Sequence, residues 1–166
     1  SFTQNVSWVS ADERLADTRE RYLLWDGSAS WLQRFGIPIY TVLSANWQLT
    51  ARRELPSADL YQAGGLYSVR GYEQNVITGA RGYAASFEVR WPVSKRFTPY
   101  LFVDHGGIQA VSPSSEKITG AGAGLSWQWN DWLGGQIDLA RALTHIEPDQ
   151  DRNQVHFRIN LAFEGG

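Results

Sequence analysis

The sequence predicts an all-β protein, specifically an antiparallel up-and-down transmembrane β-barrel segment with eight strands. Apolar and polar residues alternate with a period of two over most of the chain, which is typical of strands with two different faces. Long polar connections alternate with short turns, as in outer-membrane barrels. Aromatic residues make up 13% of the chain and include eight Trp, a load that suits a large β core or the interfacial girdles of a membrane barrel.

Eight segments have the alternation of strands. The clearest is YAASFEVRW, 83–91, where Tyr83 and Phe87 share one face while Ser86 and Glu88 share the other. Taken in order, the predicted strands are 2–9, 28–36, 37–50, 83–91, 99–106, 120–129, 132–140 and 155–163.

The connections between these strands are of two kinds. We expect long ones at 10–27, 51–81, 107–117 and 142–153, and short ones near 36–37, 92–98 and 130–131. Only residues 11–24 have some helical character. In an up-and-down sheet, this alternation places every long connection at one end. A soluble β-sandwich or lipocalin-like barrel shows the same strand pattern, but the loop asymmetry favours the membrane barrel.

Composition excludes several classes of protein. The 15 Lys and Arg against 17 Asp and Glu leave a net charge of −2, so there is no basic field for nucleic acid. Cysteine is absent, which excludes disulfide scaffolds and thiolate metal sites. We expect no metal and no cofactor. Methionine is absent too, so we expect the chain to be processed or cut from something longer.

An enzyme is the less favoured interpretation of the polar residues. Asp104 and His105 are adjacent on a predicted strand, so they point to opposite faces and cannot form a dyad. Glu88 and Asp104 would suit paired carboxylates of an outer-membrane hydrolase, but nothing sets their separation. Asp149 and Asp151 read as a solvated loop rather than a calcium site. We therefore expect no enzymatic activity.

A glycine series marks one predicted strand. Gly120, Gly122 and Gly124 alternate with apolar residues inside 120–129. A phosphate-binding loop would lie between a strand and a helix, so these glycines are not one. We expect them to thin one face of the sheet so that another segment packs closely against it.

The stretch GGLYSVRGYEQN, 64–75, places Arg70 in an unusually long loop, and such loops are usually functional or disordered. Glycines beside Arg70 permit turns with positive φ; they are Gly64, Gly65 and Gly71. If Leu101 and Val103 face lipid, Asp104 points inward, where it would suit a bidentate pair with Arg70. From the residues alone, separate solvation of the two groups is the favoured alternative.

The chain resembles the TpsB outer-membrane transporters of two-partner secretion, in the BamA superfamily, whose members include the filamentous haemagglutinin and haemolysin transporters. Several motifs carry this resemblance, in the order of the family: LPSADLYQAGG at 55–65, the VRGY tetrad Val69, Arg70, Gly71 and Tyr72, the strand GARGYAASFEVRWP at 79–92, and the F-x-D-x-G motif at Phe102, Asp104 and Gly106. The resemblance covers essentially the whole chain.

The resemblance implies a barrel of about sixteen strands, of which residues 1–166 would supply the C-terminal half. It further implies that the loop at 51–81 folds back into the lumen, where Arg70 pairs with Asp104 on the inner wall. Ser86 and Glu88 are the expected lumenal neighbours. Phe163 would be the C-terminal insertion signal, although Glu-Gly-Gly follows it.

The implied function is passage of an unfolded TpsA-type exoprotein across the bacterial outer membrane without ATP. Other implied partners are outer-membrane lipid, the barrel assembly machinery and either the remaining barrel half or a second copy. Since the periplasmic POTRA domains and the first barrel half are not among these 166 residues, we expect no transport by this chain alone. An autonomous eight-stranded barrel with a structural or adhesion role is the alternative.

Overall fold

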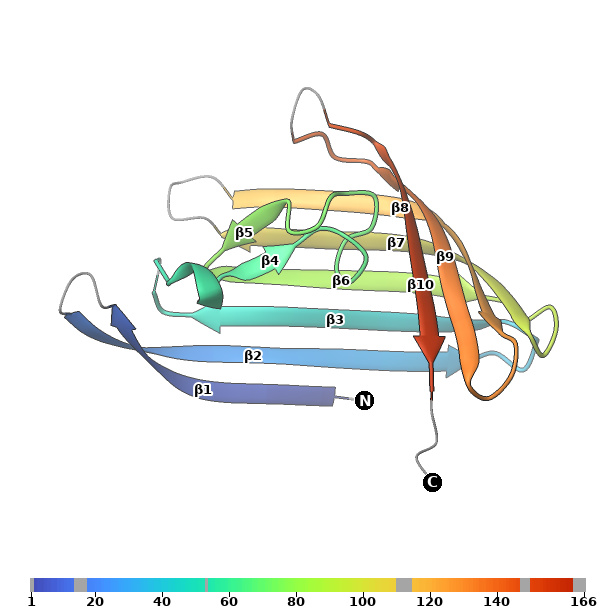
Figure 1. Cartoon of the computed structure of the whole chain (residues 1–166), viewed down its shortest axis with the longest axis horizontal. Coiled ribbons are helices and arrows are strands. Elements are labelled where there is room, and N and C mark those ends of the chain that lie inside the picture. The colour runs from blue at the N-terminus through green and yellow to red at the C-terminus, as the bar shows by residue number, and fades with distance from the viewer. Residues whose placement is uncertain (1, 14–17, 53, 110–114, 147–149, 163–166) are drawn as a thin grey trace.

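Eight strands form one antiparallel sheet (Figure 1). The computed structural model describes residues 2–13, 18–52, 54–109, 115–146 and 150–162. The sheet strands are β1 (Phe2–Glu13), β2 (Thr18–Arg34), β3 (Tyr40–Thr50), β6 (Arg81–Arg90), β7 (Phe97–Gln109), β8 (Ser115–Gln128), β9 (Leu133–Ala142) and β10 (Asn153–Leu161). Each strand pairs with the next along the chain, so the all-β, up-and-down architecture is confirmed.

Several strands are longer than predicted, and the strict alternation of long and short connections is wrong. Only residues 14–17 separate β1 from β2, and only 110–114 separate β7 from β8. The strands continue into polar sequence, where apolar alternation gives no signal but backbone pairing goes on. The helical character expected at 11–24 is also wrong, since the described residues of this stretch, 11–13 and 18–24, are strand. Here strand pairing overrides the local helix propensity.

The two faces of the sheet differ as expected. In β7, Leu101 is 53% exposed and Val103 is 49% exposed, whereas Tyr100, Phe102 and Asp104 are buried. Exposed apolar side chains cover the same outward face of the other strands, among them Leu43, Phe87, Leu139, Val155, Phe157 and Ile159. An apolar outer face over a polar inner face is typical of strands that span a lipid bilayer.

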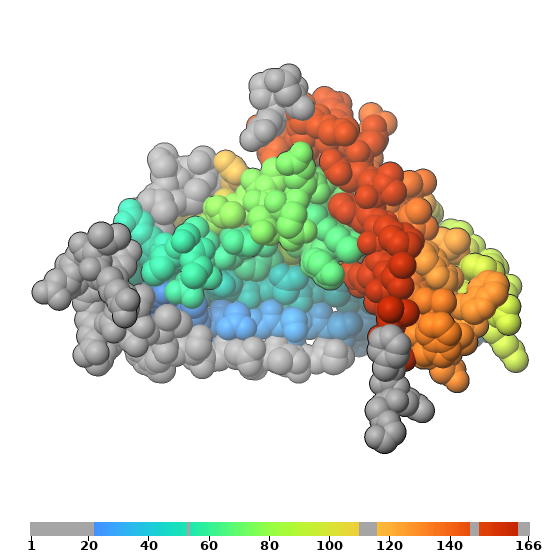
Figure 2. Space-filling view, in the orientation of Figure 1, coloured from blue at the N-terminus to red at the C-terminus, as the bar shows by residue number. Residues whose placement is uncertain are grey.

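The connection between β3 and β6, residues 51–80, has structure of its own. It contains a 3-10 turn, η1 (Ser57–Asp59), and two short antiparallel strands, β4 (Tyr61–Ala63) and β5 (Ile77–Gly79). Figures 1 and 2 show this segment against the concave face of the sheet. No helix in the described part of the chain is long and apolar enough to cross a membrane.

A small apolar core joins the loop to the inner face of the sheet. Val69, Tyr72 and Ile77 from the loop pack with Ile108 of β7 and Ile118 of β8, and all five are at most 5% exposed. Full burial of such side chains stabilises by about 1.5–3 kcal/mol each. The loop is therefore anchored by apolar packing as well as by polar contacts, and it lies on the concave side of the sheet rather than outside it.

The sheet has two open edges. Its strand order begins at β1 and ends at β10, and within the described ranges these two strands do not pair. Unpaired edges present rows of free N–H and C=O groups that favour pairing with another strand.

Candidate functional site

A tight glycine turn presents the VRGY tetrad. Gly64, Gly65 and Gly71 have φ angles of 114°, 88° and 95°, which confirms the expected positive-φ positions. The Gly65 amide donates to the Val69 carbonyl at 3.0 Å. The Ser68 hydroxyl accepts from the Gly64 amide at 2.8 Å and donates to the Gly64 carbonyl at 3.0 Å. These contacts close a compact turn that directs Arg70 towards the sheet.

Arg70 binds Asp104 through two parallel hydrogen bonds. Its Nε lies 2.7 Å from Asp104 Oδ2, and one terminal nitrogen lies 2.9 Å from Oδ1. The Arg70 backbone amide also donates to Oδ2, at 3.0 Å. Arg70 is 5% exposed and Asp104 is 0% exposed. Such forked, charge-assisted pairs fix geometry as well as adding binding energy, so this arrangement holds both the side chain and the backbone of Arg70 in place.

The same guanidinium reaches two further strands. A terminal nitrogen lies 2.9 Å from Glu88 Oε1 and donates to Ser86 Oγ at 3.1 Å, both on β6. The other terminal nitrogen lies 3.2 Å from Asp138 Oδ1, on β9. The ring of Phe102 lies under the guanidinium, 3.5 Å from its carbon to the ring centre, a cation–π geometry. Arg70 thus ties the loop to β6, β7 and β9 at once.

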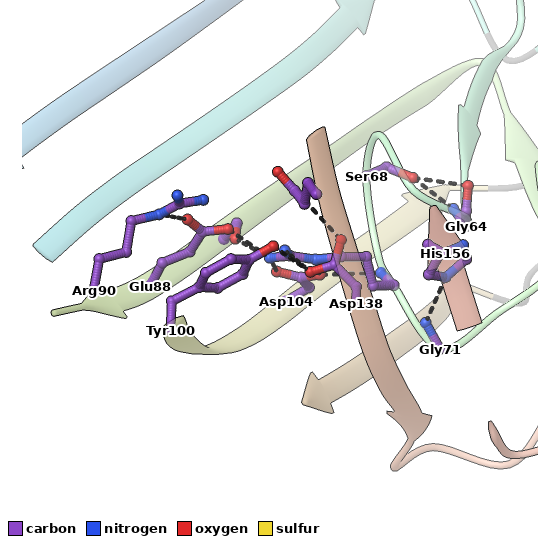
Figure 3. A network of polar contacts seen from close by, with 12 residues as sticks. Gly64, Ser68, Gly71, Glu88, Arg90, Tyr100, Asp104, Asp138 and His156 are labelled. Atoms are coloured by element: carbon purple, nitrogen blue, oxygen red, sulfur yellow. Dashed lines mark hydrogen bonds and ion pairs between the residues drawn. The ribbon is translucent and has the colours of Figure 1, made fainter. Parts of the chain in front are cut away.

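Glu88 and Asp138 are held by groups of the sheet itself (Figure 3). The Tyr100 hydroxyl donates to Asp138 Oδ1 at 2.5 Å, and the Gln136 amide donates to Oδ2 at 2.7 Å. Arg90 binds Glu88 Oε2 at 2.6 Å, and its guanidinium lies 4.1 Å from the centre of the Tyr100 ring. These two carboxylates therefore stay oriented independently of the loop.

Asp104 differs, because every hydrogen bond to its carboxylate in the described structure comes from Arg70. Three carboxylates surround two guanidiniums, those of Arg70 and Arg90, so the cluster has a formal charge of 2 − 3 = −1. Burial alone lowers the pKa of Arg70, but the hydrogen bond and charge of Asp104, aided by Glu88 and Asp138, raise this pKa above its already high ordinary value. Arg70 is therefore a permanent cation.

Tyr72 fastens the other side of the turn to Thr119 in β8 and to Thr144, just after the end of β9. Its hydroxyl oxygen lies 2.7 and 2.9 Å from the carbonyls of Thr119 and Thr144, which share its single hydrogen, and it accepts from their amides at 3.2 and 3.0 Å. Val69 packs on Gly106, where an added Cβ would lie 2.8 Å from a Val69 methyl group. The glycine of the F-x-D-x-G motif therefore makes room for the valine of the VRGY tetrad.

The glycine series on β8 does what the sequence predicts. A Cβ on Gly120 would overlap the carbonyl oxygen of Arg70, and one on Gly124 would overlap the Tyr100 ring. A Cβ on Gly122 would lie 2.6 Å from the Phe102 ring. The thinned wall that was expected is confirmed: the motif turn packs against it at Gly120, whereas aromatic side chains of β7 pack against it at Gly122 and Gly124.

The other polar candidates lie outside this cluster. His105 faces away from Asp104, as expected, and contacts Tyr83 and Thr119. Asp151 accepts a hydrogen bond from the Asn153 amide in an exposed loop. Asp149 and Phe163 lie outside the described residues. No group of three metal-ligating side chains occurs in the described ranges.

Asp138 is the site residue that sequence reasoning missed. It follows Ile137 and precedes Leu139 in β9, and the alternation places it on the inward face with Gln136 and Ala140. The available signal was that Asp138 is the single acidic residue among the small and polar residues that face inward on β9. The path of the loop, which brings Arg70 to it, leaves no trace in strand periodicity.

Three comparisons place the chain among known proteins. The family model of haemolysin secretion/activation protein ShlB/FhaC/HecB matches residues 1–127. The chain is similar to protein TOC75-3, chloroplastic, of Arabidopsis thaliana, with 46% identity over 114 residues, 64% of this chain and 13% of the relative. It is also similar in structure to CdiB from Acinetobacter baumannii, with a TM-score of 0.70 and 22% identity, over 86% of this chain and 27% of CdiB. The chain thus spans less than a third of either protein.

Proposed function

Because the chain belongs to the haemolysin secretion/activation protein family ShlB/FhaC/HecB, we propose that it forms part of an outer-membrane pore that passes an unfolded exoprotein to the cell surface. The β-barrel fold and the outer-membrane location follow from membership of this family of transporters. The proposal concerns the cargo, the absence of an ATP requirement and the role of the motif loop.

The docked motif loop is the observation that carries the proposal. Arg70 is buried against Glu88, Asp104 and Asp138 on three different strands of the inner wall. If the loop served only to fill the interior of a small barrel, apolar side chains would do so at a lower cost in free energy, since buried ion pairs seldom add net stability over apolar packing. Ion pairs between the loop and a polar lumen are suited to a segment whose position controls passage through the barrel. The VRGY tetrad supplies the loop side of these contacts, and the F-x-D-x-G motif supplies the wall side.

The concave face beside the loop has room and a polar lining. A hollow of about 240 Å³ lies next to the turn, and its walls include Ser44, Asn46, Glu88, Arg90 and Arg158. Polar and charged walls bind water and make no lasting apolar contact with an extended chain. An apolar segment of an unfolded polypeptide would find little at these polar walls to retain it. No nucleotide is needed in this mechanism, because folding of the exoprotein outside draws it outward.

We assign residues 1–166 to the C-terminal half of the barrel. The open edges at β1 and β10 support this assignment, because a barrel in lipid has to satisfy every backbone group internally. The remaining half or a second copy would pair with these edges. The barrel assembly machinery would insert the whole, and a TpsA-type exoprotein would be the cargo. In this role the carboxylates Glu88 and Asp104 hold Arg70 and perform no hydrolysis.

Reconstitution tests this function. The full-length protein is placed in liposomes without nucleotide, and entry of a protease-sensitive, unfolded exoprotein is followed together with ion conductance. We expect translocation and an open-pore conductance. A strict requirement for ATP would contradict the proposed mechanism. Absence of both conductance and translocation by a correctly folded barrel would favour the structural or adhesion role, and turnover of lipid or peptide substrates would favour a hydrolase.

A further inference from the structure

A groove runs across the outward face of the sheet, on the opposite side from the motif loop. It has a volume of about 410 Å³ and is bounded by β3, β6, β7 and β8, close to the ends from which the motif loop departs. Trp47, Leu49 and Tyr83 give it apolar walls, and Arg81 and Lys117 lie at its margin. This volume is in the range of small-ligand sites, so the groove is large enough for part of a lipid.

Strand register brings these residues together. Trp47 lies opposite Tyr83, Tyr83 opposite Gly107, and Gly107 opposite Lys117, which makes one continuous row across four strands. Gly107 lets the Tyr83 ring and the Lys117 side chain approach each other over its position, because an added Cβ would lie 3.1 Å from the Tyr83 ring and 3.3 Å from Lys117 Cγ. The row therefore brings the aromatic side chains of Trp47 and Tyr83 next to the cationic side chain of Lys117.

Neither cation has an acidic partner in the described ranges. The Arg81 guanidinium donates to the side-chain carbonyl of Gln109 at 3.3 Å and to the Ala51 carbonyl at 3.1 Å, and both acceptors are neutral. Lys117 is exposed. Its neighbour Glu116 is also exposed, but alternation directs consecutive strand residues to opposite faces. The groove thus carries uncompensated positive charge beside an apolar wall.

The groove lies where an outward-facing surface meets lipid headgroups. An outward cation costs about 2–4 kcal/mol at the bilayer midplane and little near the interface, so Arg81 and Lys117 mark the interfacial level. Trp and Tyr are enriched at the same level, which agrees with Trp47 and Tyr83. We propose that the groove binds one anionic phospholipid, with its phosphate between Arg81 and Lys117 and an acyl chain along Trp47, Leu49 and Tyr83.

Lipid binding here would act on the base of the motif loop. Arg81 is the first residue of β6, and its contact with Ala51 bridges the two ends of the loop segment 51–80. A phosphate bound to Arg81 would hold that bridge in place. The proposal rests on the outward surface alone and does not depend on what the pore transports.

Lipid retention tests the proposal directly. The full-length protein is reconstituted in vesicles of phosphatidylcholine that contain a minor fraction of phosphatidylglycerol, then extracted gently, and the lipid that stays bound is identified by native mass spectrometry. We expect one retained phosphatidylglycerol. The double variant Arg81→Gln/Lys117→Gln should bind it about 30-fold more weakly, because each basic residue near a membrane surface contributes roughly five- to sixfold in affinity.

Lys95→Gln is the matched control. Lys95 is also an exposed cation but lies in the connection between β6 and β7, at the other end of the strands, so this variant should retain phosphatidylglycerol like the unmodified protein. The heat-modifiable mobility of each folded barrel excludes misfolding as the cause of a loss. Equal retention of phosphatidylcholine, or unchanged retention of phosphatidylglycerol by the double variant, would overturn the proposal.

Discussion

Replacing Asp104 by Asn should release the motif loop, and replacing Asp138 by Asn should release it much less. The two substitutions are equally small, and both carboxylates are 0% exposed. They differ in their other partners. Asp104 is held by Arg70 alone, whereas Asp138 also accepts hydrogen bonds from Tyr100 and Gln136. Loss of the charge at 104 therefore removes the forked pair, while loss at 138 removes one contact of 3.2 Å.

The expected magnitudes follow from these contacts. Removing one partner of a buried ion pair costs about 3–5 kcal/mol. Since Arg70 keeps Glu88 and Asp138, we expect about 3 kcal/mol for Asp104→Asn, a shift of roughly 100-fold in loop docking. For Asp138→Asn the lost charge-assisted bond is worth about 1.5 kcal/mol, or roughly tenfold.

A buried thiol reports loop docking. The 166 residues contain no cysteine, and Val69 is 0% exposed in the docked loop. In a Val69→Cys background, the rate of maleimide labelling is proportional to the undocked fraction. We expect labelling to accelerate most with Asp104→Asn, about ten times less with Asp138→Asn, and not at all with Asp151→Asn, a control in an exposed loop.

Two outcomes would refute this reasoning. If Asp104→Asn leaves the labelling rate unchanged, the Arg70 pair does not hold the loop. If both substitutions accelerate labelling equally, the unequal support of the two carboxylates has no energetic consequence. Heat-modifiable mobility, measured on the same samples, separates loop release from loss of the barrel.

Three further substitutions test other contacts of the same account. Gly120→Ala places a methyl group on the Arg70 carbonyl and should accelerate Val69→Cys labelling, whereas an unchanged rate would mean that the turn packs elsewhere. Tyr72→Phe removes the hydroxyl that accepts from the half-buried amides of Thr119 and Thr144, a loss of about 1 kcal/mol for a hydrogen bond. Hydrogen exchange should quicken most at the Thr119 amide, because the Thr144 amide keeps a 3.4 Å contact with the Thr119 carbonyl. Unaltered protection of Thr119 would contradict the fastening role. Leu101→Arg puts a charge on the lipid face, which costs up to about 2–4 kcal/mol of stability, so the urea midpoint of the barrel should fall. The control Leu101→Phe should leave the midpoint unchanged. Equal midpoints for the two variants would contradict a lipid contact at this position.

The inner wall was predictable from strand alternation. Once Leu101 and Val103 are assigned to lipid, alternation directs Asp104 inward, and the glycines on β8 indicate a close contact on that face. The ends of the strands were not predictable in the same way. Polar residues at 11–13 and 18–24 continue the ladder through backbone hydrogen bonds, which need no apolar pattern.

The contacts between loop and wall lie beyond what periodicity contains. Arg70 and Asp104 are 34 residues apart and Arg70 and Asp138 are 68 apart, and no local rule determines the path of a 30-residue connection between β3 and β6. The expected proximity of Arg70 and Asp104 came from the resemblance of the two motifs to a family. Asp138 belongs to neither motif, so only the folded geometry brings it to Arg70.

Secretion per folded barrel in an Arg70→Ala variant tests the central claim most directly. Exoprotein released to the medium is measured in the same cells as heat-modifiable barrel in the outer membrane, with the unmodified full-length protein as reference. Because the strand ladders do not depend on Arg70, we predict that the folded amount is unchanged while secretion per barrel falls about tenfold or more. Equal loss of barrel and secretion, or full secretion without Arg70, would contradict the account.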